Sequence, residues 1–128
     1  MERAIEVFAA IQLTVIGVSH IFHHRAWAEF FIWLRGKGLP GVFANGFTNL
    51  AMGSMIVGFH RVWSGVPLVL TVFGVLNVVK AAHSFLLPER SLRLMSRVSL
   101  ERSWEFAAAG VVALVLAAVT AYGVVSGT

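Results

Sequence analysis

The sequence predicts an all-α integral membrane protein, a bundle of four transmembrane helices in one domain that covers residues 1–128. Of these 128 residues, 58% are hydrophobic and only 12% are charged, whereas soluble domains have about 25% charged residues. The chain also contains four long apolar stretches, each close to the roughly 20 residues that a helix needs to cross a bilayer. The stretches lack the alternation typical of a membrane β-barrel.

The four predicted spans cover residues 4–22, 42–59, 64–87 and 104–125. The first span follows Glu2 and contains Glu6, where a signal peptide would have a basic cluster, so we do not expect it to be cleaved. The chain has no cysteine, which excludes disulfides and thiolate metal sites.

The basic residues predict the orientation in the membrane. Arg3 and Arg61 lie on one side. Seven others lie in the two longer connections: Arg25, Arg35, Lys37, Arg90, Arg93, Arg97 and Arg102. Because cytoplasmic loops are enriched in Lys and Arg, we expect these connections in the cytoplasm and both termini on the non-cytoplasmic side of the cell inner membrane. Orientation thus accounts for the net charge of +4, and we expect no nucleic-acid partner.

Both longer connections are predicted to contain amphipathic interfacial segments. In the first, a helical stripe continues from the end of the first span to the sequence GKGLPG at residues 36–41. In the second, Pro88 begins a segment with Arg90, Arg93 and Arg97 on one face. Segments of this kind suit the headgroup layer of a membrane.

The chain suggests a 2+2 parallel internal repeat, with half-repeats of about residues 1–65 and 66–128. Each half has a span, a histidine near its end, an interfacial segment, a second span and a Ser-Gly pair. His20 aligns with His83 at an offset of 63 residues, and Ser64 with Ser126 at an offset of 62. Two halves with an even number of spans would be related by an axis along the membrane normal.

Small residues predict where the helices pack closely. The second span has Ser54 and Gly58, and the fourth has an alanine at every fourth residue from Ala109 to Ala121. In lipid, such rows allow two helix backbones to approach each other. At the opposite surface, His60 with Arg61 and Trp63 is predicted to be an interfacial anchor.

Polar residues within the spans gather near the predicted cytoplasmic ends and form the candidate ligand-binding set: Lys80, Asn77, His83, Asn49, Asn45, His20 and Glu105. Lys80 lies seven residues before the end of its span, roughly 10 Å deep, where a cation costs about 2.5–3.5 kcal/mol. An ionisable group at this depth indicates a functional site by default. The structural alternatives are snorkelling to the headgroups or an ion pair with Glu105.

Three functions stay open from the sequence. The first is binding or transport of a small ligand in a cytoplasm-facing polar cavity, where one cation and several neutral donors suit an anion. The second is an accessory subunit of a larger redox complex, with His20 and His83 available to a haem or quinone. The third is a small intramembrane enzyme for a lipid-like substrate, in which a histidine and Glu105 transfer protons.

The sequence requires no cofactor and identifies no catalytic residue. The expected partners are membrane lipid and either further copies of the chain or the other subunits of a membrane complex. The candidate ligands of a haem or metal are again the two histidines near the span ends, His20 and His83.

Overall fold

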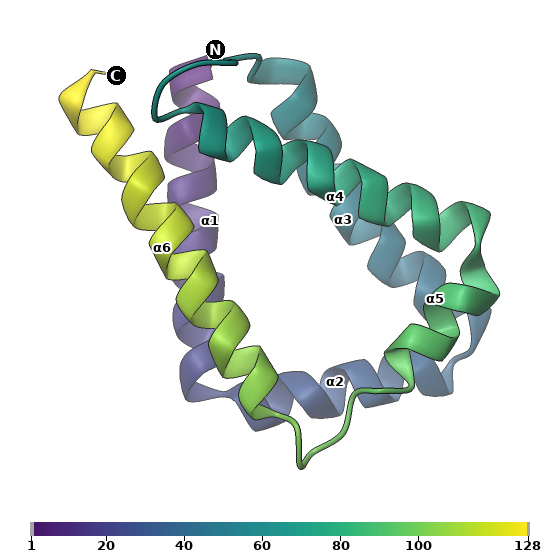
Figure 1. Cartoon of the computed structure of the whole chain (residues 1–128). Helices are drawn as coiled ribbons and strands as arrows, with labels where there is room; N and C mark the ends of the chain where they lie inside the picture. The colour runs from purple at the N-terminus through teal and green to yellow at the C-terminus, as the bar shows by residue number, and fades with distance from the viewer. Residues whose placement is uncertain (1, 128) are drawn as a thin grey trace.

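The computed structural model describes residues 2–127 and confirms the all-α class (Figure 1). Within this range the helices are α1 (Glu2–Phe22), α2 (His24–Gly36), α3 (Leu39–Phe59), α4 (Leu68–Leu86), α5 (Pro88–Met95) and α6 (Trp104–Ser126). By length and composition, α1, α3, α4 and α6 can cross a membrane. They are the four spans expected from hydropathy.

Three of the predicted spans agree with the observed helices to within three residues, but the third span begins later than predicted. Residues 60–67 connect α3 to α4 without α-helix. Gly65 has a positive φ of 72°, and Pro67 is the N-cap of α4. The predicted start at Ser64 was wrong. Gly65 and Pro67 indicate a turn, but the apolar residues around them led to this turn being counted as part of the span.

Both longer connections contain a helix, as predicted. α1 ends and α2 begins around His23, whose φ of −126° and ψ of 36° interrupt the helical path. At Gly38 the φ of 68° turns the chain into α3. α5 begins at Pro88, a residue suited to the first helical turn, but it ends at Met95, so Arg97 lies beyond the helix.

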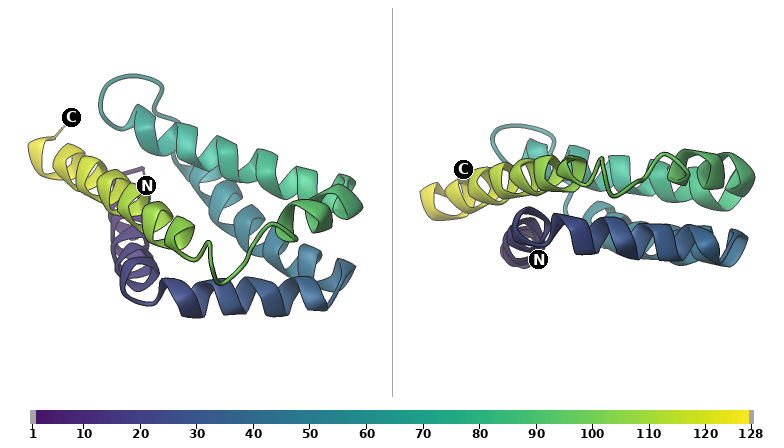
Figure 2. Two further views of the ribbon diagram at one scale, coloured as in Figure 1. Left: turned by 60° about the horizontal axis from the view of Figure 1, so that its bottom comes forward. Right: turned by 90° about the horizontal axis from the view of Figure 1, so that it is seen from below.

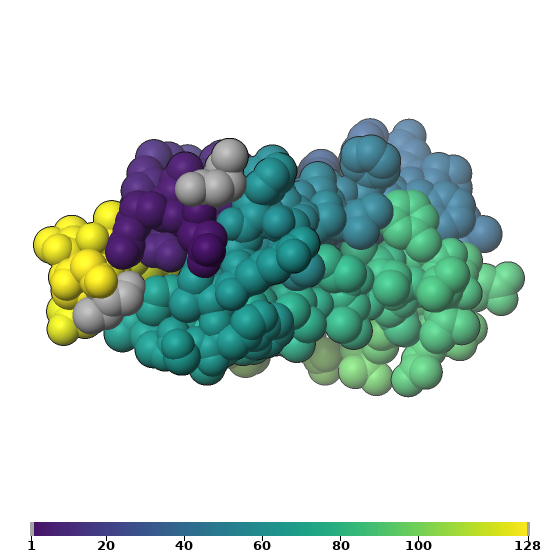
Figure 3. Space-filling model, turned by 90° about the horizontal axis from the view of Figure 1, so that it is seen from above, coloured from purple at the N-terminus to yellow at the C-terminus, as the bar shows by residue number. Residues whose placement is uncertain are grey.

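The four spanning helices form two pairs, α1 with α6 and α3 with α4. The first three helices make one layer and the last three make the other (Figure 2). The two pairs meet at the end of the bundle that holds both termini, here called the termini end, and diverge toward α2 (Figure 1). At the termini end, the start of α1 lies against the connection before α4 (Figure 3).

Each pair is packed through two glycines. A Cβ at Gly110 would lie 2.6 Å from the carbonyl oxygen of Gly17 across the α1–α6 contact. Across the α3–α4 contact, a Cβ at Gly53 would lie 2.9 Å from the carbonyl oxygen of Gly74. Close packing through small residues is typical of membrane helices. Of the predicted positions, Gly58 was wrong, since it has open space around it, whereas Ala117 of the alanine row is buried.

The two glycine contacts are related by one offset in the sequence. Gly74 follows Gly17 by 57 residues, and Gly110 follows Gly53 by 57 residues. The first two glycines lie in LTVIGV (13–18) and LTVFGV (70–75), which are identical at five of six positions. This register differs from the offset of 63 that aligns the histidines, since His20 follows Gly17 by three residues and His83 follows Gly74 by nine. The division into half-repeats stays a prediction.

An apolar cluster joins the two pairs near the termini end. Ile5 and Ala9 of α1 contact Ile56 of α3 and Leu70 of α4, and further apolar side chains pack on this cluster. At the wide end a second cluster joins α2, α3 and α5 through Leu34, Val42 and Met95. The bundle is therefore closed directly at one end and through the connecting helices at the other.

Arg35 ties α2 to the end of α5. Its guanidinium lies 3.2 Å from the carbonyl oxygen of Met95 and 3.1 Å from that of Ser96, and it also contacts the carbonyl oxygen of Val98. The Met95 carbonyl also accepts from the backbone N–H of Val98 at 3.1 Å, so Arg35 adds a charged donor to the turn that follows α5.

We expect Arg35→Met to lower the free energy of unfolding by about 1.5–3 kcal/mol, the usual contribution of hydrogen bonds to a charged group. Hydrogen exchange at residues 95–98 should become faster in the same variant. The control is Arg25→Met, because the 3.9 Å ion pair of Arg25 with Glu29 is exposed and such pairs contribute little. Equal effects of both substitutions would contradict the role of Arg35.

Candidate functional site

A group of buried polar side chains lies where the two helix pairs meet. Glu6, His60 and Thr71 are 4%, 0% and 1% exposed. They belong to α1, to the residue that follows α3, and to α4. Burial of polar and ionisable groups is costly unless they bond to one another, and within a membrane such groups mark functional sites.

Hydrogen bonds connect the three side chains in a row. His60 Nε2 lies 2.9 Å from Glu6 Oε2, and His60 Nδ1 lies 2.9 Å from Thr71 Oγ1. The Thr71 hydroxyl donates to the carbonyl oxygen of Val62 at 2.7 Å. Because a hydroxyl has a single hydrogen, Thr71 is the acceptor toward His60, and His60 Nδ1 is therefore the donor.

Arg3 extends this row toward α6 and the surface. Its guanidinium donates to Glu6 Oε1 at 2.9 Å and to the carbonyl oxygen of Gly123 at 3.0 Å. The Arg3 side chain is 47% exposed, while that of Glu6 is 5% exposed. We call Arg3, Glu6, His60 and Thr71 the polar network; it bonds to all four spanning helices or to the residues at their ends.

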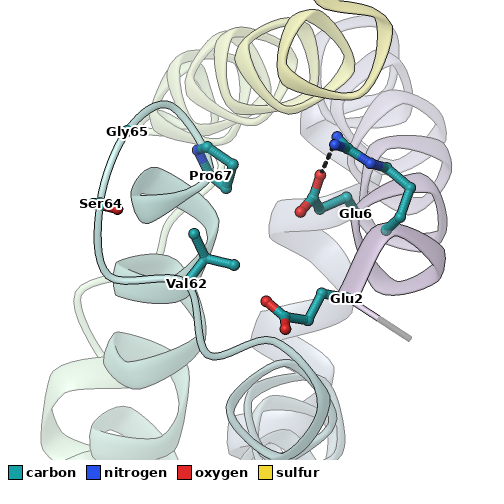
Figure 4. A pocket seen from close by; sticks show the side chains of 7 residues that line it. Glu2, Glu6, Val62, Ser64, Gly65 and Pro67 are labelled. Atoms are coloured by element: carbon teal, nitrogen blue, oxygen red, sulfur yellow. Dashed lines mark hydrogen bonds and ion pairs between the residues drawn. The ribbon is translucent and has the colours of Figure 1, made fainter. Parts of the chain in front are cut away.

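A pocket of about 590 Å³ lies beside the polar network (Figure 4). On one side it is lined by Glu2 and Glu6 of α1, and on the other by the connection before α4. The full lining is Glu2, Arg3, Glu6, Val62, Ser64, Gly65 and Pro67. The Glu6 carboxylate therefore stands between the pocket and the buried imidazole.

The interpretation of His60 as an interfacial anchor was wrong. His60 is fully buried, because α1 crosses the end of α3 at Glu6, and the sequence gives no direct sign of that crossing. The three-residue spacing of Arg3 and Glu6 was a usable signal, since it places both charges on one helix face. This spacing was overlooked because charged residues near the start of a span are expected at the membrane surface.

Two residues of the predicted site lie on the α4 face that carries Phe73, and Asn77 on this face packs against α3, since a Cβ at Gly53 would lie 2.9 Å from the Asn77 Cβ. Phe73 packs against the cluster that contains Ile5. Asn77 and Lys80 follow Phe73 by four and seven residues and so share its helix face. Lys80 is exposed, and within residues 2–127 its ammonium has no carboxylate within ion-pair distance, so the alternative pair with Glu105 is not formed.

Two further predicted residues lie on the equivalent face of α3. Asn49 and Asn45 precede Met52 by three and seven residues, and Met52 packs against the same apolar cluster as Phe73. Asn49 Nδ2 donates to the carbonyl oxygen of Asn45 at 3.0 Å. We call Asn45, Asn49, Asn77 and Lys80 the inward face of the α3–α4 pair.

The remaining predicted residues lie elsewhere. His83 Nδ1 is 2.7 Å from Ser91 Oγ, across the junction of α4 and α5. His20, in the other helix pair, has its Nδ1 2.8 Å from the carbonyl oxygen of Ile16. Glu105 is exposed at the start of α6. The two histidines thus belong to different helix pairs.

Comparison of the chain with protein-family models, with curated proteins and with solved structures found no match. Across residues 2–127, no group of three or more His, Asp or Glu side chains is arranged to hold a metal ion.

Proposed function

We propose that this membrane protein binds or transports a small ligand between its two helix pairs, on the inward face of α3 and α4. The observation that supports this most is the exposed Lys80 ammonium, which has no carboxylate within ion-pair distance among residues 2–127. The pairs contact each other at the termini end and diverge toward α2 (Figure 1).

The chemistry of the inward face favours a small anion. Lys80 supplies one positive charge, and its contacts do not include a carboxylate among the described residues. Asn77 Nδ2 donates to the carbonyl oxygen of Phe73 at 2.9 Å, but an amide NH₂ has a second hydrogen. A carboxylate or inorganic anion would accept from both side chains.

We also propose that α2 lies at the cytoplasmic surface of the cell inner membrane. Phe30 and Trp33 are exposed on α2, and Lys37 Nζ lies 5.0 Å from the centroid of the Trp33 ring. Aromatic and basic side chains together are typical of the membrane interface. A second copy of the chain would complete the enclosure, because four helices surround little volume.

The test is a thermal-stability screen of the purified protein in lipid nanodiscs, with inorganic anions and small mono- and dicarboxylates as probes. A ligand at about 100 times its Kd stabilises the folded state by about 2.7 kcal/mol. We expect at least one anion to raise the unfolding temperature of the wild type and to lose this effect in Lys80→Met.

The control for this test is Lys37→Met, which removes a cation from α2 and leaves the inward face unchanged. Stabilisation by the anion should persist in that variant. If no anion stabilises the wild type, or if Lys80→Met responds like the wild type, the proposed ligand site is wrong.

A further inference from the structure

We propose that Glu6, His60 and Thr71 form a proton-binding site, and that the bound proton holds the two helix pairs together at the termini end. The proton would then be the ion coupled to ligand movement. That coupling rests on the proposed function, whereas the proton site rests on the hydrogen bonds of the polar network alone.

A count of hydrogens in the network supports the site. Three hydrogen bonds run in series, from Glu6 to His60, from His60 to Thr71 and from Thr71 to the carbonyl oxygen of Val62. Thr71 supplies one hydrogen and a neutral imidazole supplies a second. The third must be a titratable proton, placed either on Glu6 or on the second imidazole nitrogen. The bonded network therefore contains one proton more than ionised Glu6 and neutral His60 have.

Loss of this proton leaves two hydrogens for three bonds, so one bond must break. If His60 keeps its hydrogen on Nδ1, two lone pairs face each other across the 2.9 Å between His60 Nε2 and Glu6 Oε2. If the hydrogen moves to Nε2, Thr71 must turn its hydroxyl away from Val62. The first case, which the proposal requires, separates α1 from the end of α3; the second would free only the connection before α4 and leave the α1–α3 contact closed.

The charged surroundings favour a single bound proton. On α1, Arg3 contacts Glu6, and Glu2 lines the neighbouring pocket. Arg61, which follows His60, is exposed and lines a second pocket with Glu2. α4 contributes the neutral Thr71, and α6 contributes the carbonyl oxygen of Gly123. A second proton would leave a buried imidazolium without a carboxylate, close to the Arg3 guanidinium. The contact should therefore weaken on both sides of a pH optimum, with the alkaline side due to loss of the single proton.

The absence of cysteine allows spin labels to be placed at chosen positions. We choose Val7→Cys on α1 and Gly58→Cys on α3, because Val7 is 43% exposed and Gly58 has open space around it. Double electron–electron resonance in nanodiscs then measures the distance between the two labels at about pH 6 and at about pH 9. This interval covers much of the range in which histidines change charge. The reference pair, Gly58→Cys with Val69→Cys, lies within the α3–α4 pair.

We expect the population with the longer α1–α3 distance to rise about tenfold at the alkaline pH, the factor for the loss of about one buried hydrogen bond. The reference pair should not change. If the α1–α3 distance distribution is the same at both pH values, the proposal is wrong.

Two variants separate proton binding from a merely structural role. Glu6→Gln supplies its own N–H to His60 Nε2, so all three bonds form without a titratable proton and the alkaline opening should disappear. Thr71→Val removes two of the three bonds; the neutral imidazole then needs only its bond to Glu6, and the alkaline opening should again disappear.

The matched control is Glu2→Gln, which alters the same pocket but no bond of the network, and it should open like the wild type. An alkaline opening that persists in Glu6→Gln would overturn the proposal. Constant opening of Thr71→Val at both pH values would also overturn it, because the network would then be only structural. Anion stabilisation through Lys80 is measured separately, so failure of one proposal leaves the other distinguishable.

Discussion

Replacement of Gly110 by valine should lower the free energy of unfolding by about 3 kcal/mol, at the upper end of the usual cost of overpacking. The new Cβ would lie 2.6 Å from the carbonyl oxygen of Gly17 and 2.9 Å from the Cβ of His20. Both neighbours belong to the backbone or to the first side-chain atom of α1, so neither can move without shifting the helix. α1 and α6 would have to separate along their contact.

Reversible unfolding in mixed micelles measures this effect. Gly53→Val should behave similarly in the other pair, since its Cβ would lie 2.7 Å from the backbone nitrogen of Val78. Gly58→Val is the matched control, because a Cβ at Gly58 has no heavy atom of a neighbouring residue within 4 Å. If Gly58→Val destabilises the protein as much as Gly110→Val, the loss does not come from the glycine contacts.

The sequence was sufficient for the spans because a membrane imposes a length and an apolar composition that few other structures share. It was not sufficient for the pairing of the helices. Gly17 and Gly110 lie 93 residues apart, and no local pattern shows that they meet. The alanine row of α6 was the more regular motif, yet Ala109 and Ala121 at its two ends are exposed. Regular spacing identifies a face that allows close packing, but the contact itself depends on the partner helix.

The candidate site, like the fold, could be predicted from the sequence only in part. Helix periodicity was enough to place Asn77 and Lys80 on one face of α4, because both residues belong to a single helix. The polar network joins Glu6, His60 and Thr71 from three segments, and each of these residues taken alone has an ordinary local explanation. A glutamate at the start of a span and a histidine at the end of another both suit an interface. Only their mutual contact shows that they are buried.

The second large effect should come from His60→Leu, which removes one partner of a buried hydrogen-bonded pair. Such single removals typically cost about 3–5 kcal/mol because the remaining charge or polar group is left uncompensated. Glu6 Oε2 would lose its partner, although Glu6 Oε1 would keep its bond to Arg3 at 2.9 Å. We therefore expect a value near the lower limit, about 3 kcal/mol, in the same unfolding measurement.

The double variant Glu6→Leu/His60→Leu decides what the polar network contributes. Leucines at both positions can extend the neighbouring cluster of Ile5 and Ile56, and apolar replacement of a buried ion pair is often neutral or stabilising. The free energy of unfolding of the double variant should thus exceed, by at least about 2 kcal/mol, the value expected if the two single effects simply added. It should also show no alkaline opening between α1 and α3. If the losses of unfolding free energy in the two single variants add up in the double variant, Glu6 and His60 stabilise the bundle independently. If the double variant is stable and shows no pH response, the role of the pair is proton binding.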